Sequence, residues 1–458
     1  MLGACYARKV GAANAPWFRR TGPAGQSAVL KSAAFAGPLA QLVEQRTLNP
    51  LVVGSNPTRP TNTAQGRPFG VGPRAFCLQS HPLILAIDAH SARISPRTVW
   101  TFVRARDEAG RIGWGEATLN DRANEIHSHV ARNAPLWIGK RARPSHDAVT
   151  VGDDAAEAAA LCAIDQAVWD LAAQAQGVPL AAALGVPRTA SLALYANINR
   201  GTHDRSPAGF AARAREAAGR GFRAIKVAPF DDVRAEDLRT DAGQRRFDLG
   251  VERVLAVREA IGPACDLMVD CHWRLDEHSA GEALARLEPA RLFWLECPLP
   301  EKVGTLGALK RLRAQANARG VRLAGCETMT ALSGFRPFLD AGAYDAIMPD
   351  VKYAGGLAEM LRIGDEARRR GVLCSPHNPT GPIAHLASVH VAAILDSCPF
   401  LEFQYGESAH FLDLCDRAIP DPNGGASALP GGAGLGAGLD LAKLAALAVD
   451  PLPARSPA

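Results

Sequence analysis

Short apolar runs alternate with longer amphipathic stretches between about residues 190 and 404. Runs that are apolar throughout and bounded by polar residues are typical of parallel strands covered on both faces. There are eight of them, at residues 192–197, 224–227, 267–270, 292–296, 322–324, 346–348, 372–374 and 400–403. The stretches between them carry apolar residues at helical spacing, for example at residues 207–220, 248–260, 280–287, 306–319, 356–370 and 385–395.

Eight strands alternating with helices predict a closed parallel barrel of the (β/α)8 type, in the α/β class. An open doubly wound sheet is the alternative. It is less favoured because such sheets usually have about six strands, and the sequence shows no glycine-rich dinucleotide fingerprint. The sequence therefore predicts a barrel at residues 189–404.

A different pattern precedes the barrel, at residues 81–188. Three runs with strand character, at 83–94, 99–106 and 112–117, are separated by turn residues and predict an antiparallel meander. Two helices are expected after them, at 124–136 and 155–175. These elements predict a small α+β domain. Residues 405–445, rich in Gly, Pro and Ala, are expected to pack back on this domain, and residues 446–458 to be a disordered tail.

The first 80 residues differ from the rest in composition. They hold nine Arg or Lys and one acid, Glu44, and show no sustained period. The run at 37–60 resembles the translation of a transfer-RNA gene, as found when a start codon is assigned too far upstream, and an organelle transit peptide is the alternative. On either interpretation we expect residues 1–80 to be disordered and without function.

Charge and composition exclude several classes of function. The net charge is +5, of which the first 80 residues contribute +8, so the body carries −3 and offers no basic face to nucleic acid. No apolar run approaches the ~20 residues that span a bilayer. The ten cysteines are scattered and form no C-x-x-C pair, which favours reduced thiols and a cytoplasmic location.

Polar residues stand at the carboxyl end of almost every predicted barrel strand, where the active site of such a barrel lies. In chain order they are Lys226, Asp270 with His272, Glu296, Glu327, Asp350, His377 and Glu402. Asp270 and His272 are two residues apart, so an extended strand would place them on one face. Three of the acids, Asp270, Glu296 and Glu327, end successive strands and are expected to converge. Because carboxylates cannot share a buried mouth without a counter-charge, they predict one hard cation, Mg²⁺, per active site.

Two local motifs and these strand ends make residues from about 83 to 411 resemble the enolase superfamily, in its mandelate racemase and muconate lactonizing branch. The motifs are Gly-Trp-Gly-Glu-Ala at 113–117 and Ala-Ile-Asp-Gln-Ala-Val-Trp-Asp at 163–170. The resemblance implies a (β/α)7β barrel with an N-terminal α+β capping domain completed by the C-terminal segment. It also implies three Mg²⁺ ligands at Asp270, Glu296 and Glu327, and an Asp350–His377 dyad that removes a proton α to a carboxylate.

Departures from the branch pattern select a subgroup. Racemases and cycloisomerases of the branch typically carry Lys-x-Lys on the second strand, whereas here Lys226 is followed by Val and Ala228. The Asp270-x-His272 pair and the Pro-His-Asn-Pro-Thr-Gly-Pro run at 376–382 are instead similar to galactonate and mannonate dehydratases. Cys297 stands where an acid commonly follows the fourth-strand ligand. The resemblance therefore implies a sugar acid dehydratase that converts an aldonate-type acid to a 2-keto-3-deoxy acid.

Within that resemblance each residue has an expected role. His377, oriented by Asp350, is the base, and His272 is the acid that protonates the departing hydroxyl. Glu402 is expected to hydrogen-bond the substrate or its enediolate, and Lys226 to neutralise the substrate carboxylate. Four further residues are expected to contact substrate: Asn197, Trp273, Asn378 and Lys352.

Two other functions stay open at this point. One is a racemase, epimerase or cycloisomerase that uses His272 and His377 as two bases. The other is a barrel that binds a sugar acid without catalysis, although no metal carboxylate is lost. A small-molecule partner is expected, with no nucleic acid and no membrane, and assembly as a homo-oligomer of two to eight copies.

Overall fold

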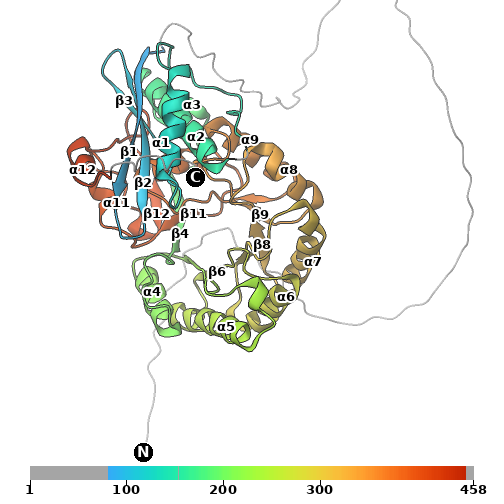
Figure 1. Ribbon diagram of the computed structural model, residues 1–458. Helices are drawn as coiled ribbons and strands as arrows, with labels where there is room; N and C mark the ends of the chain where they lie inside the picture. The colour runs from blue at the N-terminus through green and yellow to red at the C-terminus, as the bar shows by residue number, and fades with distance from the viewer. Residues whose placement is uncertain (1–80, 153, 450–458) are drawn as a thin grey trace, which may run out of the picture. The chain divides into compact units, whose positions relative to one another are not determined.

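The computed structural model describes residues 81–152 and 154–449, so the expectations for residues 1–80 and for the end of the C-terminal tail lie outside the described residues. The capping domain begins with an antiparallel sheet in the order β1-β2-β3 (Figure 1). Its strands are β1 (Ile84–Arg93), β2 (Val99–Asp107) and β3 (Ile112–Glu116). The helices α1 (Ala123–Asn133), α2 (Ala155–Ala175) and α3 (Leu180–Leu184) follow. The predicted meander and both longer helices are confirmed.

The barrel domain consists, in the described residues, of eight parallel strands and the seven α-helices that connect them. The strands are β4 (Ser191–Asn197), β5 (Ala224–Val227), β6 (Asp266–Asp270), β7 (Trp294–Glu296), β8 (Arg322–Gly325), β9 (Ala346–Ile347), β10 (Leu373–Cys374) and β11 (Leu401–Gln404). The helices are α4 (Pro207–Gly219), α5 (Asp241–Ile261), α6 (Glu277–Arg286), α7 (Leu306–Asn317), α8 (Ala331–Ala341), α9 (Leu357–Arg369) and α10 (Pro382–Ala392). Helix α8, which contains Pro337, lies in the one interval between strands for which no helix bounds were predicted.

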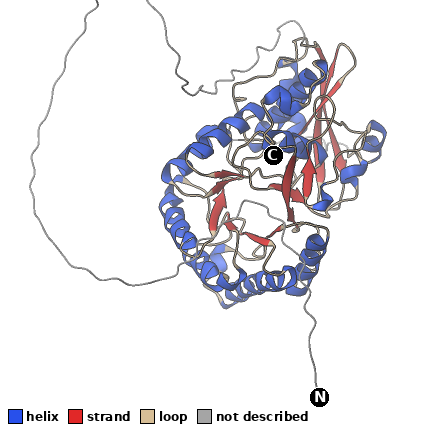
Figure 2. Ribbon diagram, turned by 180° about the vertical axis from the view of Figure 1, so that it is seen from behind, coloured by secondary structure: helices blue, strands red, loops and turns tan. Residues whose placement is uncertain are grey.

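The strands follow the order β10-β9-β8-β7-β6-β5-β4-β11, and every neighbouring pair is parallel. The helices surround these strands on the outside (Figure 2). In the described part of the chain no ladder joins β10 to β11. The Ser375 hydroxyl spans that gap and donates to the carbonyl of Phe400 at 2.7 Å. The (β/α)7β architecture implied by the resemblance is confirmed.

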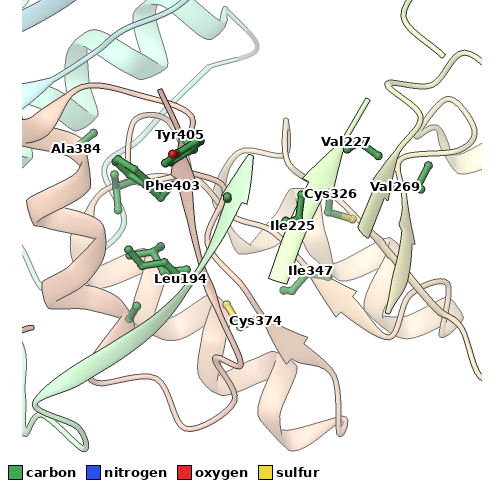
Figure 3. Close-up of a cluster of buried hydrophobic side chains, with 14 of the residues drawn as sticks. Leu194, Ile225, Val227, Val269, Cys326, Ile347, Cys374, Ala384, Phe403 and Tyr405 are labelled. Carbon is green, nitrogen blue, oxygen red and sulfur yellow. The ribbon is translucent and has the colours of Figure 1, made fainter. Parts of the chain in front are cut away.

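The strand period of two divides the inside of the barrel into an apolar lower layer and a polar upper layer. Near the start of their strands, Ala224, Met268 and Trp294 point inward and pack with Tyr195, Ala324, Ala346 and Met348. Two residues further along the same strands come Lys226, Asp270 and Glu296. The outward-facing residues, such as Leu194, Ile225 and Phe403, pack against the surrounding helices (Figure 3). The apolar layer therefore closes the barrel floor, and the polar side chains stand above it at the mouth.

Capping domain and barrel meet at β3, on the first motif. Gly115 lets α2 approach closely, because a Cβ there would lie 1.9 Å from the carbonyl oxygen of Ala163. The next residue, Glu116, is fully buried and reaches the barrel. Its carboxylate accepts bonds from the N–H of Gly381 at 2.8 Å and of Ala384 at 2.9 Å. It thereby satisfies free N–H groups at the start of α10, the helix whose N-terminus favours negative charge.

Helix α2 joins the same two parts through the second motif. Asp165 accepts a bond from the N–H of Leu357, the first residue of α9, at 2.9 Å. Asp170 accepts from the N–H of Leu435 in the C-terminal segment at 2.8 Å. That segment contains α11 (His410–Asp413), β12 (Ala426–Ala428), which pairs antiparallel with β4, and α12 (Leu441–Ala446). The C-terminal segment thus completes the capping domain, as the resemblance implied.

Two other expectations concern the described residues. Their eight cysteines are all free thiols, and seven of these are buried. Among the same residues no helix has both the length and the apolar character that a membrane crossing requires.

Helix α10 is buried on all sides and contains two histidines, His385 and His390. His390 accepts from the N–H of Ala181 through Nδ1 and donates from Nε2 to the carbonyl of Leu435, so it is neutral. Burial lowers the pKa of His385 to about 4, and that of His390 to about 4. Both folded pKa values lie below the usual value of about 6.5, so protonation favours the unfolded chain.

We predict that Glu116→Gln lowers the thermal stability markedly. Besides the two N–H donors, the carboxylate accepts from the hydroxyls of Thr118 and Thr380, and an amide group would turn an N–H₂ toward these donors. The expected loss is about 3 kcal/mol, since a buried, charged acceptor is lost. Calorimetry should show it. Glu125→Gln, on the exposed surface of α1, is the control and should change little; equal melting of the two variants would contradict the role of Glu116.

We also predict a loss of stability in mild acid. The cost of burying the two α10 histidines is absent above about pH 6.5, grows as the pH falls and is complete below about pH 4, at on the order of 3 kcal/mol each. Thermal melts between pH 7.5 and 4.5 should show that His390→Gln flattens this pH dependence, although it destabilises the fold at pH 7.5. His278→Gln, at an exposed position, serves as the control. A slope identical to wild type in His390→Gln would refute the prediction.

Candidate active site

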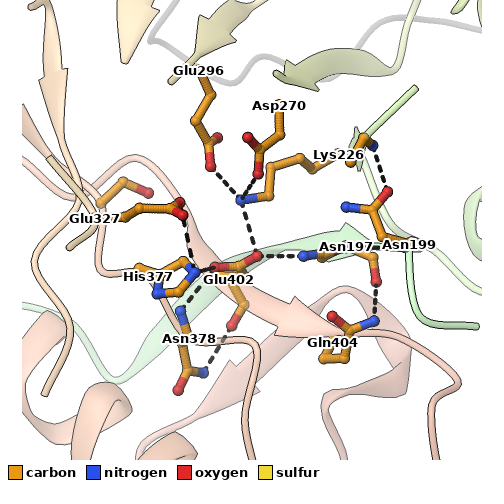
Figure 4. Close-up of polar contacts among 12 residues, drawn as sticks. Asn197, Asn199, Lys226, Asp270, Glu296, Glu327, His377, Asn378, Glu402 and Gln404 are labelled. Carbon is orange, nitrogen blue, oxygen red and sulfur yellow. Dashed lines mark hydrogen bonds and ion pairs between the residues drawn. The ribbon is translucent and has the colours of Figure 1, made fainter. Parts of the chain in front are cut away.

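Three carboxylates lie together at the mouth of the barrel. Asp270 ends β6 and Glu296 ends β7, and the two are register partners in neighbouring parallel strands. Glu327 follows two residues after β8. One oxygen atom from each lies within 4.8 Å of the other two, and all three side chains are buried (Figure 4). The structure therefore brings the three predicted ligands together.

Lys226 lies among these acids instead of pointing away toward a ligand. Its Nζ is 2.5 Å from Glu296 Oε1, 3.5 Å from Asp270 Oδ2 and 3.1 Å from Glu402 Oε1. Burial lowers the pKa of Lys226, but the charges of Glu296 and Glu402 raise it more, so the ammonium form is strongly favoured. The sequence suggested that Lys226 neutralises a substrate carboxylate; in the structure it neutralises carboxylates of the protein.

The donor set fits a hard divalent cation. Four carboxylates, including Glu402, face one ammonium group, so the mouth keeps excess negative charge. Burial raises the pKa of Glu296, Lys226 opposes this, and Asp270 and Glu327 raise it again, so that it ends well above its usual range. Glu327 Oε2 is buried and has no hydrogen-bond partner. A cation such as Mg²⁺, held by Asp270, Glu296 and Glu327, would satisfy that oxygen and reduce the repulsion.

His377 approaches the cluster from the loop after β10. Its Nδ1 is 2.8 Å from Asp350 Oδ2, which leaves Nε2 facing the cluster, 3.6 Å from Glu327 Oε2 and 4.0 Å from Glu402 Oε2. Burial lowers the pKa of His377, while Glu327, Glu402 and the bond to Asp350 raise it above its usual value. The predicted dyad is therefore formed, with its free ring nitrogen turned toward the carboxylates.

His272 lies near Asp270, on the side of the cluster away from His377. The backbone that brings it there is not the extended strand that was predicted. Strand β6 ends at Asp270, and His272 has a left-handed backbone with φ of 45°. The expectation that Asp270 and His272 share a strand face is wrong in its reasoning, because the backbone turns sharply after Asp270. The turn still returns the ring to Asp270, with Nε2 3.1 Å from its Oδ2. Nδ1 lies 2.6 Å from a carboxylate that the sequence analysis did not single out, Asp231.

Three residues that were predicted to contact substrate instead hold acids of the site in place: Asn197, Asn378 and Lys352. Asn197 donates to Glu402 Oε1 at 2.7 Å, and the backbone N–H of Asn378 donates to its Oε2 at 2.8 Å. The amide of Asn378 also bonds the carbonyl of Glu402 and the ring of His385, so its polar atoms are used within the protein. Glu402 is thus held rigidly, with its oxygens between Lys226 and His377.

Lys352 and Trp273 differ in their surroundings. The Lys352 ammonium is 2.9 Å from Asp350 Oδ2, so this buried side chain supports the dyad carboxylate. Trp273 is half-buried beside His272, with ring centroids 6.5 Å apart, and its predicted contact with substrate stays a prediction. Tyr353, which sequence reasoning missed, donates to the carbonyl of Glu327 and lies 3.3 Å from His377 Nδ1. Its place directly after the Asp350-x-Lys352 run was the available signal.

The two histidines belong to strands far apart in the sheet. His272 follows β6 and His377 follows β10, with β7, β8 and β9 between them in the sheet order. In a ring of eight strands this places them on opposite sides of the mouth, with the carboxylate cluster between. A ligand held at the cluster would present one side to each histidine, so the site can remove a proton on one side and supply one on the other.

Comparison with known proteins identifies the family of the chain. Residues 78–185 match the family described as "Mandelate racemase / muconate lactonizing enzyme, N-terminal domain", and residues 209–443 match the family described as "Enolase C-terminal domain-like". A D-galactonate dehydratase of Ralstonia nicotianae is 28% identical over 335 residues, which cover 70% of this chain and 83% of that protein. A D-gluconate dehydratase of Thermoproteus tenax is 29% identical over 336 residues, covering 71% and 64%.

Among solved structures, a mandelate racemase/muconate lactonizing enzyme-like protein from Rubrobacter xylanophilus superposes with a TM-score of 0.72 at 29% identity. The superposition covers 81% of this chain and 98% of that one. The two family matches span both the capping domain and most of the barrel. The chain therefore belongs to the mandelate racemase and muconate lactonizing branch of the enolase superfamily.

Proposed function

We propose that this protein is a Mg²⁺-dependent dehydratase of a sugar acid, removing water from an aldonate-type acid to give a 2-keto-3-deoxy acid. The observation that carries the proposal is the pair of histidines on opposite sides of the carboxylate cluster, each with its own aspartate partner. A one-base elimination needs a base and a separate acid, and the pair provides both. The D-galactonate and D-gluconate dehydratases among the relatives support the same substrate class.

His377 is the base in this proposal. Its Nδ1 is held by Asp350, so Nε2 is the nitrogen available to take the proton from the carbon α to the substrate carboxylate. When the ring becomes positive, Asp350 and Glu402 stabilise it by their charge. A bound Mg²⁺ would supply electrostatic stabilisation of the negative charge that develops on the substrate carboxylate. Ala228 carries no base, so the described mouth offers no lysine equivalent at that position.

His272 is the acid. It gives its proton to the β-hydroxyl as the C–O bond breaks, so the group leaves as water, and the resulting enol becomes the 2-keto-3-deoxy acid. Glu402 lies between Lys226 and His377 and is placed to accept a hydrogen bond from a substrate hydroxyl or enol. Asn197 and Asn378 fix that carboxylate in place.

Metal dependence is the first prediction that follows from the proposed function. Excess chelator should abolish turnover and added Mg²⁺ should restore it, with the 2-keto product detected by semicarbazide. Glu296→Gln should bind Mg²⁺ weakly in calorimetric titration and lose turnover, because one charged ligand is gone. It should stay folded, because the remaining carboxylates repel one another less and Lys226 keeps its contact with Glu402. Glu288→Gln, at an exposed position, is the matched control, and full activity in excess chelator would contradict the metal site.

The proposed function also predicts different effects of replacing His377 and His272. In D₂O, His272→Asn should still exchange the α-proton of the substrate, since His377 is intact, but should not eliminate water. His377→Asn should do neither. Each lost step should slow by about 10²–10⁴, the usual value of a positioned acid or base. Proton NMR with D-galactonate and D-gluconate measures both steps at once.

The same experiment distinguishes the alternative function. If wild type exchanges the α-proton and inverts the α-carbon without forming a 2-keto acid, the two histidines act as opposing bases and the protein is an epimerase. Exchange that persists in His377→Asn and vanishes in His272→Asn would reverse the two roles. Turnover of neither acid by wild type would exclude these two substrates and leave the broader sugar acid set to be screened.

A further inference from the structure

We propose that Asp231 is a positioning residue that holds the imidazole of His272 in the orientation needed to donate a proton; this rests on the proposed dehydratase function. Asp231 lies four residues after β5, in the loop that follows Val227, and it touches neither the carboxylate cluster nor Lys226 among the contacts of the described residues. Its action on the reaction therefore passes through His272 alone.

The ring of His272 is fixed at both nitrogens. Nδ1 is 2.6 Å from Asp231 Oδ1, and Nε2 is 3.1 Å from Asp270 Oδ2. The side chain is about one-third exposed at the edge of the mouth, so little packing restrains it. A hydrogen bond at Nδ1 fixes which ring nitrogen faces the substrate, as a carboxylate partner does for a catalytic histidine. Without that bond only the contact with Asp270 would restrain the ring, which could then turn about its side-chain torsions and lose its alignment with the departing hydroxyl.

The backbone that carries the His272 ring has an unfavourable left-handed conformation. His272 and Trp273 are consecutive non-glycine residues with φ of 45° and 57°. Left-handed backbone costs roughly 1–2 kcal/mol for each such residue, and it persists where surrounding contacts enforce it. The Trp273 N–H is held by the carbonyl of Cys297 at 2.7 Å, which fixes the main chain. The main chain thus fixes the position at which the His272 side chain begins. The contact with Asp231 fixes the orientation of its ring.

Asp231 is itself held by a second residue, which makes it a rigid support. Arg205 donates from Nη2 to Asp231 Oδ2 at 2.9 Å and to the carbonyl of Ala228 at 2.8 Å. Its guanidinium lies 4.5 Å from the centre of the Phe210 ring, so the arginine is also packed. Each Asp231 oxygen therefore accepts one bond, from His272 or from Arg205. An asparagine at this position has one acceptor oxygen and can satisfy only one of the two donors.

The neighbouring residue provides a matched control. Asp232 accepts from Arg253 with both oxygens, at 2.8 and 3.1 Å, and among the interactions of the described residues it bonds neither His272 nor His377. Arg253 also bonds the carbonyl of Pro229, just as Arg205 bonds that of Ala228. The two aspartates are adjacent, comparably exposed and each paired with one arginine of the same loop system. They differ in that only Asp231 turns its second oxygen to His272.

The test compares Asp231→Asn and Asp232→Asn in the full chain with Mg²⁺ and D-galactonate or D-gluconate in D₂O. Asp231→Asn should slow dehydration by about 10–10², the effect of misplacing a reacting group by about 1 Å, while α-proton exchange by His377 persists. Asp232→Asn should leave both rates within about threefold of wild type. Asp231→Asn added to His272→Asn should slow nothing further, because the residue acts through a ring that is no longer there.

A crystal structure of Asp231→Asn supplies a readout that does not depend on turnover. The His272 ring should be rotated or disordered there and ordered in Asp232→Asn. Equal dehydration rates in the two single variants, an added loss in the His272→Asn background, or an unmoved ring would each overturn the role of Asp231 while leaving the dehydratase function intact. If wild type dehydrates neither acid but inverts the α-carbon, the proposed function fails and the role of Asp231 as support of a proton donor fails with it.

Discussion

The burial of four carboxylates at one end of an apolar barrel is the constraint on which the arrangement of the site depends. Asp270, Glu296, Glu327 and Glu402 stand directly above a floor of aromatic and aliphatic side chains, where water cannot screen them. A single ammonium, that of Lys226, lies among them and contacts three of the four. The unbalanced negative charge favours a cation at the mouth, and it also raises the pKa of His377, which faces the carboxylates.

Two of the carboxylates in the mouth, Glu296 and Glu402, are held by neutral donors as well as by the Lys226 ammonium. Trp294, from the apolar floor, donates its indole N–H to Glu296 Oε2 at 2.8 Å. Asn197 and Asn378 do the same for Glu402. Because these donors come from strands and strand ends, Glu296 and Glu402 are oriented before any ligand arrives. Such preorganisation is what electrostatic catalysis requires, since charge must be stabilised without rearrangement of the site.

The capping domain contributes to the site by holding the loops of the dyad. Asp350 lies in the loop that leads into α9, and the first N–H of that helix is bonded by Asp165. His377 lies in the loop that leads into α10, whose N-terminus is bonded by Glu116. Two capping-domain acids therefore anchor the two helices that follow Asp350 and His377. This gives the two motifs at residues 113–117 and 163–170 a physical function, at a distance from the reacting atoms.

From the sequence alone, the barrel, the capping meander and the convergence of the carboxylates Asp270, Glu296 and Glu327 could be predicted. These follow from local rules: apolar runs mark buried strands, and an acid at the end of three successive strands must converge with the others because parallel strands end at one edge. The dyad and the family were also accessible, since their motifs are short and contiguous.

Which charges meet became clear only from the tertiary structure. Lys226 proved to neutralise protein carboxylates, Lys352 to support Asp350, and His272 to reach Asp270 through a left-handed turn instead of a strand face. Asp231 lies 41 residues before the ring it holds. Such pairings depend on side-chain direction across separate loops, which no periodicity in the chain encodes.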